Sequence, residues 1–219
     1  MSFIKLLAIH ADQMDPTAYY RGVGCFRPME KMGVMCDMYE HSWVTTYIPS
    51  TRSNPNSEKK IDGRYHVAQK VFGWASLMTY DVVFMQRLVG ADSVQLARYV
   101  QSSGVPIWYD LDDDFWSIPA TYSIAKYYNA EMLATIETII SIADLVTVST
   151  PALAERVKLV TGKDAVVVPN AWDLNRWGFA TEWNESGPVV WRGGETHFDE
   201  LNTYRDFFEQ SDLERSEEH

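Results

Sequence analysis

The chain has 219 residues, of which 46% are hydrophobic and 13% aromatic, so it can bury a full core and differs in composition from disordered proteins. Its formal net charge of -11 would repel a phosphate backbone, and its Lys and Arg residues form no cluster with aromatic residues. These features argue against nucleic acid as a main partner. The length fits one large domain, or one domain with part of a second.

The cysteines and the N-terminal apolar run bear on the cellular compartment. Cys25 and Cys36 are the only cysteines, and they lie in neither a C-x-x-C nor a zinc-ligand spacing. We therefore expect two reduced thiols and a cytoplasmic protein. The run FIKLLAI stops before His10 and is too short to span a membrane, so we predict a strand there. We expect no transmembrane segment in the chain.

Short apolar runs alternate with longer segments of helical spacing along the chain. Strands are predicted at residues 3–9, 34–39, 81–86, 105–110, 145–149 and 165–169, and helices at 17–31, 93–102, 124–143 and 152–160. Gly33, Gly104 and Gly162 are expected to end three of these helices. The alternation predicts an α/β fold, a Rossmann-like parallel sheet with helices on both faces.

The pattern changes after residue 169. Residues 170–188 are rich in Trp, Asn and Gly without a clear period, which indicates a linker or crossover and a boundary near Gly187. We expect a first domain over 1–187 and, over 188–219, the first strand (from residue 189) and the first helix (residues 198–210) of an incomplete second domain. About 30 residues are too few for an independent domain. This segment is expected to pack on the first domain, to pair with another chain, or to begin a longer sequence.

Polar residues follow each predicted strand, where ligands bind in doubly wound sheets. They are His10, Gln86, Arg87, the aspartates of YDLDDDFW, Ser149 and Asn170. His10 is a cleft residue or a hydrogen-bonded strand-end histidine. Ser149 and Thr150, before Pro151, are expected to begin a helix by capping it.

The run YDLDDDFW admits several interpretations. A calcium loop of the EF-hand type is excluded, because Phe115 stands where glycine is required. Asp110 and Asp112 could share a divalent ion, as in the Asp-x-Asp site of a GT-A transferase. The aspartates could instead cap the next segment and face solvent, or one of them could orient or deprotonate an acceptor hydroxyl group.

The sequence ADLVTVSTPALAERV, followed by VVVPNAWD, resembles the end of the N-terminal domain of retaining GT-B glycosyltransferases. That family often has Asn-Gly-Val-Asp here. Asn170 and Asp173 match this pattern, whereas Ala171 and Trp172 depart from it. Together with AYYR, YDLDDDFW and RGGETHFDEL, in this order, most of the chain is similar to glycosyltransferase-like proteins of bacteria and tailed phages.

The resemblance implies transfer of a sugar from a nucleotide-sugar donor to a hydroxyl-bearing acceptor, with no metal and no further cofactor. It implies that Asp112 or Asp113 lies on the acceptor side and acts in catalysis. The substrate-binding residues that it implies are His10, Tyr20, Arg21, Asn170, Asp173, Arg192, Gly193, Gly194 and His197. Among these, Arg21 could instead form a surface ion pair, Arg192 to Gly194 an ordinary turn, and His197 a helix start.

The rest of the family's donor site, including its acidic pair, lies further along a complete C-terminal domain. We therefore expect this chain alone to be at most a feeble transferase. Two alternatives stay open: a binding or assembly protein (or one half of a split enzyme completed by a second chain) that keeps the GT-B N-terminal fold, and a metal-dependent GT-A-type transferase.

Overall fold

The computed structural model describes residues 3–11, 16–40, 77–171 and 202–206. The chain divides into two compact units. Unit 1 comprises Met1–Ser117 and Tyr128–Trp172, and unit 2 comprises Ile118–Tyr127 and Asp173–His219. The sheet, its helices and the candidate site described below all belong to unit 1.

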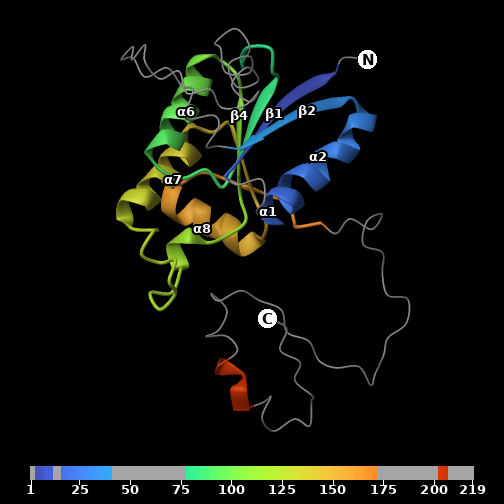
Figure 1. Ribbon diagram of the computed structural model, residues 1–219. Helices are drawn as coiled ribbons and strands as arrows, with labels where there is room; N and C mark the ends of the chain where they lie inside the picture. Colours follow the sequence, from blue (N-terminus) through green and yellow to red (C-terminus); the bar gives the residue numbers. More distant parts are fainter. Residues whose placement is uncertain (1–2, 12–15, 41–76, 172–201, 207–219) are drawn as a thin grey trace, which may run out of the picture. The chain divides into compact units, whose positions relative to one another are not determined.

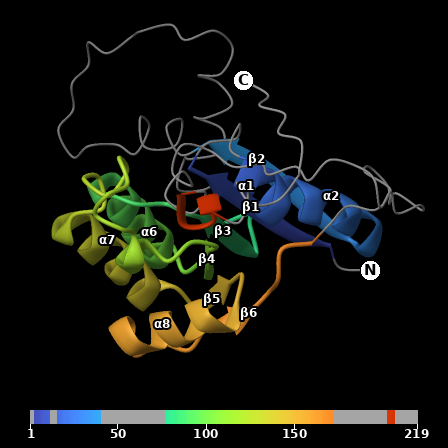
Figure 2. The ribbon, with the colours of Figure 1, turned by 90° about the horizontal axis from the view of Figure 1, so that it is seen from below.

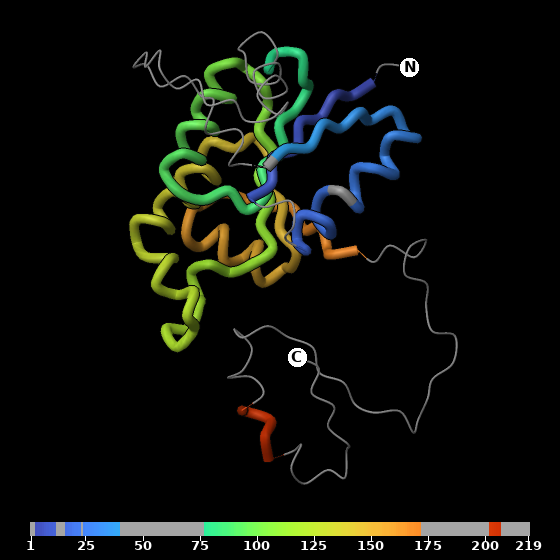
Figure 3. Tube along the Cα trace, viewed as in Figure 1, coloured from blue at the N-terminus to red at the C-terminus, as the bar shows by residue number. Residues whose placement is uncertain are grey.

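The described strands of unit 1 form a parallel sheet, which confirms the predicted fold class. They are β1 (Ile4–His10), β2 (Val34–Glu40), β3 (Val82–Gln86), β4 (Ile107–Leu111), β5 (Leu145–Val148) and β6 (Val166–Val167). Their order is β2-β1-β3-β4-β5-β6, with every pair parallel. The trace in Figure 3 leads outwards from β1 to β2 and resumes at β3, on the other side of β1. The strand order therefore reverses between β1 and β3.

Helices cover both faces of this sheet. On one side lie α1 (Pro16–Ala18), the π-helical segment η1 (Tyr19–Val23), α2 (Gly24–Met29) and the 3₁₀ turn η2 (Glu30–Met32). On the other lie α6 (Ala91–Ser102) and α7 (Ala130–Ile142), with α8 (Pro151–Thr161) against α7. Figures 1 and 2 show α1 and α2 across the sheet from α6 and α7.

The core follows the two-residue period of the strands, whose side chains alternate between the two helical layers. Towards α2, Leu6, Ala8 and Phe84 pack against Phe26, and the ring centroids of Phe84 and Trp108 lie 4.8 Å apart. Towards α6 and α7, the alternate residues are buried, among them Leu7, Ile9, Val83, Met85, Tyr109 and Val146. Burial on both faces explains why these strands read as continuous apolar runs.

Two of the predicted helices differ from the structure. The helix expected at 17–31 is divided into short pieces, since its middle is π-helical and Pro28 lies inside its last α-helical turn. The helix expected at 124–143 begins at Ala130, because the side chain of Asn129 accepts a hydrogen bond from the backbone N–H of Met132 and caps it there. The preceding residues form isolated turns, such as the bond from Tyr122 N to the carbonyl of Pro119.

The predicted helix ends are confirmed. Gly33 and Gly162 are C-caps in the left-handed conformation, with φ of 89° and 75°, and Gly104 follows α6 with φ of 74°. Thr150 caps α8 by accepting a hydrogen bond from Leu153 N, with Pro151 in the first turn.

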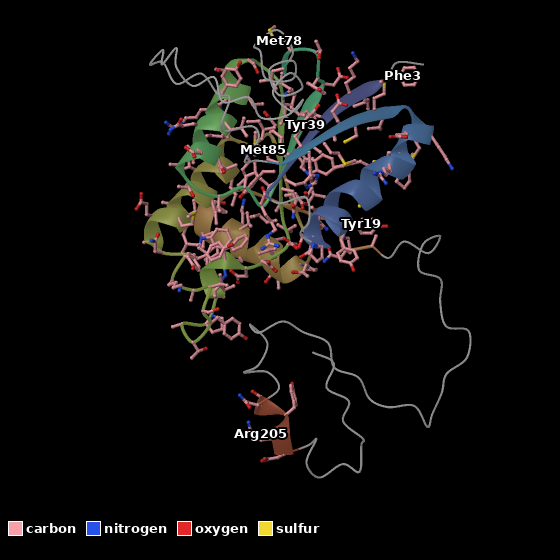
Figure 4. The ribbon with its side chains drawn as sticks, viewed as in Figure 1. Phe3, Tyr19, Tyr39, Met78, Met85 and Arg205 are labelled. Atoms are coloured by element: carbon pink, nitrogen blue, oxygen red, sulfur yellow. The ribbon has the colours of Figure 1, made fainter. Side chains whose placement is uncertain are left out.

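Two predicted features lie outside the described residues: the strand from 189 and the proposed boundary near Gly187. Of the helix expected at 198–210, residues 202–206 are described and contain helical turns; Arg205 is labelled there in Figure 4. Both cysteines are free. None of the described helices has the length and apolar composition needed to cross a membrane.

Candidate functional site

A row of four buried polar residues crosses the sheet near the carboxyl ends of its central strands. His10 on β1 is in register with Gln86 on β3, Gln86 with Asp110 on β4, and Asp110 with Thr147 on β5. Their exposed fractions are 0%, 1%, 1% and 2%. Residues in register on parallel strands share a face, so these four side chains form one continuous strip. Buried polar groups need partners, and the partners reveal what the strip does.

Arg21, in the π-helical segment η1, binds the strip through Asp110. Its Nε lies 2.9 Å from Oδ2 and its Nη2 lies 2.5 Å from Oδ1 of Asp110, and both side chains are almost fully buried. Burial alone would lower the pKa of Arg21, but the hydrogen bonds and charge of Asp110 raise it above its ordinary value. Arg21 therefore stays charged inside the domain, in a buried ion pair and not in the surface pair considered from the sequence.

The same network extends to the end of the sheet at β5 and β6. Thr147 donates a hydrogen bond to Asp110 and accepts one from the indole N–H of Trp108, at 2.7 Å. Arg21 also donates from Nη1 to the carbonyl of Val168 and, at 3.3 Å, to Oδ1 of Asn170. Most donors of Arg21 are thus occupied within the protein, and the arginine ties η1 to the strand ends.

Figure 4 shows the two ends of the sheet, with Phe3 and Met78 at the amino ends of strands and Tyr19 of η1 towards the opposite end. Tyr20 is 36% exposed, and its ring packs edge-on against Tyr19, with centroids 5.7 Å apart. Asn170 is exposed and contacts Arg21.

His10 and Gln86 lie at the point where the strand order reverses, the usual position for a ligand in such sheets. His10 Nδ1 is 3.4 Å from Gln86 Oε1, whereas His10 Nε2 and Gln86 Nε2 have no hydrogen-bond partner within the described structure. Burial lowers the pKa of His10, although Gln86 and Asp110 oppose the shift, so the ring is neutral near pH 7. A neutral ring that donates from Nδ1 leaves Nε2 as an acceptor.

Gly22 explains how the helical layer comes so close to this histidine. A Cβ atom at position 22 would lie 2.1 Å from Cε1 and 2.7 Å from Nε2 of His10. Only glycine permits that approach, so the residue after Arg21 is fixed by packing.

Asp112 and Asp113 follow β4 and differ in their surroundings. The side chain of Asp112 is 10% exposed and that of Asp113 is 58% exposed. Burial, together with the charge of Asp113, raises the pKa of Asp112 to about 6, against the lowering effects of Arg87 and a hydrogen bond with Thr17. Oδ1 of Asp112 is buried and has no hydrogen-bond partner among the described residues.

The other aspartate of the run has a local structural role. Asp114 accepts a hydrogen bond from the backbone N–H of Trp116, in the 3₁₀ turn η3 (Phe115–Ser117), and pairs with Arg156 of α8 at 3.1 Å. This is the capping use that was one of the sequence-based alternatives. Ser149, expected as a cap, instead donates from Oγ to the carbonyl of Asp112 at 2.9 Å and fixes the backbone there.

Five of the residues proposed from the sequence lie at, follow or contact the carboxyl ends of strands: His10, Arg21, Asp112, Asp113 and Asn170. The others apart from Tyr20, namely Asp173, Arg192, Gly193, Gly194 and His197, lie outside the described residues. Sequence reasoning missed Thr17 and Thr147 and gave Arg87 no role. Their partners are distant in sequence, and only the packing of the strands and of α1 brings them together. Within the described ranges, no group of three or more His, Cys, Asp or Glu side chains is arranged to hold a metal ion.

No protein-family model matches the sequence, and no curated protein matches it. Among solved structures, the chain is similar to a conserved protein from Enterococcus faecalis V583, at 14% identity over 71% of this chain and 98% of that chain, with a TM-score of 0.36. It is also similar to fructokinase from Xylella fastidiosa, at 16% identity over 74% of this chain, with a TM-score of 0.31. That alignment covers 49% of the fructokinase chain.

Proposed function

We propose that this chain carries the acceptor-side domain of a nucleotide-sugar-dependent glycosyltransferase, in which Asp112 binds the acceptor hydroxyl group and takes its proton. The observation that carries the proposal is the state of Asp112. It is a largely buried carboxyl group after the fourth strand of a parallel sheet, with a pKa of about 6 and one oxygen that has no hydrogen-bond partner in the described structure.

Such a carboxyl group suits general-base chemistry near neutral pH. A base with a pKa close to the working pH is ionised for much of the time and still binds a proton well. The acceptor oxygen would form the new bond to the anomeric carbon on the same face from which the diphosphate oxygen departs, as retention of configuration in the family requires, while the bond from that carbon to the diphosphate oxygen breaks. The hydroxyl proton would pass to Asp112 Oδ1, and the nucleoside diphosphate would leave.

Asp113 would have a different part in this reaction. Its side chain is mostly exposed and lies 3.3 Å from Arg87, so its charge is neutralised in part by that arginine and in part by solvent. We assign it to the electrostatics of Asp112, because its charge raises the pKa of the neighbouring carboxyl group. The donor side would involve Arg192, Gly193, Gly194 and His197, as the family resemblance implies.

The test is a transfer assay with the full 219-residue chain. The chain is incubated with UDP-, GDP- and dTDP-linked sugars and a panel of mono- and oligosaccharide acceptors, and products are detected by mass spectrometry. We expect slow transfer that Asp112→Asn reduces by about 100-fold or more, within the usual range for loss of a general base. Asp164→Asn is the control, since Asp164 is exposed and pairs only with Lys158 at 2.9 Å in the described structure. Absence of transfer with every donor, or equal turnover by the Asp112→Asn variant, would reject the proposal.

A further inference from the structure

Arg87 has an unusual backbone conformation at the edge of the candidate site. With φ of 54°, it is the only residue other than glycine with a positive φ in the described ranges. A side chain in the left-handed region costs free energy, and such residues persist only where the surrounding structure holds them. Arg87 follows Gln86 directly, at the carboxyl end of β3.

Two hydrogen bonds with strand β4 stabilise this conformation, one made by Arg87 and one by the residue after it. The backbone N–H of Arg87 donates to the carbonyl of Asp110 at 3.0 Å. The next carbonyl, that of Leu88, accepts a hydrogen bond from the buried hydroxyl of Tyr109 at 2.7 Å. Two consecutive residues of β4 thus fix the turn in which Arg87 lies.

The guanidinium group of Arg87 then reaches three polar side chains and one ring. Nη1 donates to Thr17 Oγ1 at 3.0 Å, Nη2 lies 3.3 Å from Asp113 Oδ2, and Nε lies 3.7 Å from Asp112 Oδ1. The guanidinium carbon lies 5.8 Å from the centre of the Phe115 ring. The distance to Asp112 is too long for a hydrogen bond but short enough for a strong charge interaction.

We propose that Arg87 is the positioning residue of this site: its left-handed turn places the guanidinium group between Thr17 and the two aspartates and fixes the orientation of the Asp112 carboxyl group. Thr17 makes the arrangement specific, because its side chain contacts both Arg87 and Asp112. The inference rests on the proposed role of Asp112, but its main test needs no turnover.

The charged groups that act on Asp112 come from three elements of unit 1. Asp113 lies beside it, Arg87 follows β3, and Asp110 with its partner Arg21 lies towards η1. Of these, Asp110 and Arg21 are paired with each other, so their charges largely cancel. Arg87 is therefore the cation whose removal should change Asp112 most.

The experiment is a carbon NMR titration of aspartate carboxyl groups in the full chain labelled at that carbon, with Asp112 assigned from its loss in Asp112→Asn. The test variant is Arg87→Asn, since asparagine tolerates the left-handed conformation, with Arg87→Gly as a second variant should the first fail to fold. We expect the pKa of Asp112 to rise by roughly one unit, the lower end of the effect of a nearby opposite charge. Arg87→Lys should restore part of the difference.

Arg156→Gln is the matched control. It removes another part-exposed arginine, one that pairs with Asp114 of the same run and, within the described structure, makes no contact with Asp112. The pKa of Asp112 should stay unchanged in this variant. An unchanged Asp112 pKa in both Arg87 variants, or an equal shift in Arg156→Gln, would overturn the positioning role.

The two proposals can fail separately. If transfer is observed, Arg87→Asn should lower its rate about fivefold at pH 6 and much less at pH 8, since a one-unit rise in pKa depletes the ionised carboxylate only near pH 6. A shifted Asp112 pKa without any transfer would reject the glycosyltransferase and retain the positioning residue. Transfer with an unshifted Asp112 pKa would retain the glycosyltransferase and reject the positioning role of Arg87.

Discussion

Arg21 and Asp110 form a two-point ion pair between the π-helical segment η1 and strand β4, with Nε to Oδ2 at 2.9 Å and Nη2 to Oδ1 at 2.5 Å. Both side chains are almost fully excluded from solvent. Removing two charges from water is costly, and the planar fork of arginine repays that cost through geometry that matches a carboxylate. The ion pair therefore stabilises the packing of η1 on the sheet only when both charged side chains are present.

We expect Asp110→Asn to destabilise the domain by about 3–5 kcal/mol, because it leaves the Arg21 charge buried without a counterion. The measurement is urea unfolding followed by circular dichroism. The double variant Arg21→Met/Asp110→Leu should recover much of this loss, since a buried pair can often be replaced by apolar residues. Lys158→Met, which breaks an exposed pair with Asp164, serves as the control and should change stability little. A similar small effect of Asp110→Asn would contradict the role of the pair.

Gly22→Ala should destabilise the domain by about 1–3 kcal/mol, as expected when an extra methyl group is forced into a packed interior. The new Cβ would overlap the ring of His10, which is fully buried and packs edge-on against Phe84 with centroids 5.9 Å apart. A double-mutant cycle with His10→Ala tests the cause, since removing the ring should make the alanine at position 22 much less costly. Equal costs in the two backgrounds would place the strain elsewhere.

The difference in stability between the Asp112→Asn variant and the wild type should depend on pH in a defined direction. The pKa of Asp112 is about 6 in the folded state and 3.8 as the ordinary value, so the folded state holds its proton more tightly than the unfolded state. Ionising Asp112 therefore costs stability above about pH 6, and the cost disappears below about pH 4. We expect Asp112→Asn to match or exceed the wild type at pH 8, by at most about 3 kcal/mol, and to match it at pH 4.

Thermal unfolding across this pH range checks the prediction. Asp113→Asn is the comparison, because that side chain is mostly exposed and its removal should affect stability far less. If Asp112→Asn lost several kcal/mol at pH 8, the carboxylate would be a structural partner and not a group left free for a ligand.

The fold could be predicted from the sequence because its signals are local. Buried strands read as short apolar runs, and Gly33 and Gly162 mark helix ends by their left-handed backbone. The start of α7 was placed too early for a related reason: apolar spacing extends upstream of Asn129, whose capping side chain ends that pattern. A capping residue inside a periodic segment is a weak signal in sequence and a decisive one in structure.

The site was predicted only in part, because its contacts join distant segments. The position of His10 and Asp112 after strands follows from the parallel sheet. That Asp110 would be paired with Arg21, 89 positions away, follows from the packing of η1 on the sheet and has no local pattern. The left-handed conformation of Arg87 likewise depends on hydrogen bonds from β4.

Divalent cations should not bind tightly at Asp110 and Asp112. Both oxygens of Asp110 already have hydrogen bonds from Arg21 and Thr147, so a metal ion would have to displace a buried guanidinium group. Arg87 adds positive charge 3.7 Å from Asp112 Oδ1. Magnesium and calcium prefer six or more oxygen ligands, which two adjacent carboxylates cannot supply by themselves.

Calorimetry with magnesium, manganese and calcium tests this expectation, and no stoichiometric heat should appear at micromolar concentrations. Weak heats that persist in Asp112→Asn would reflect the net charge of -11 and not a site. A micromolar site that Asp112→Asn abolishes and Asp164→Asn retains would contradict the prediction. It would favour a metal-dependent transferase. In such a site the cation would replace Arg21 and Arg87 as the counter-charge of the two aspartates.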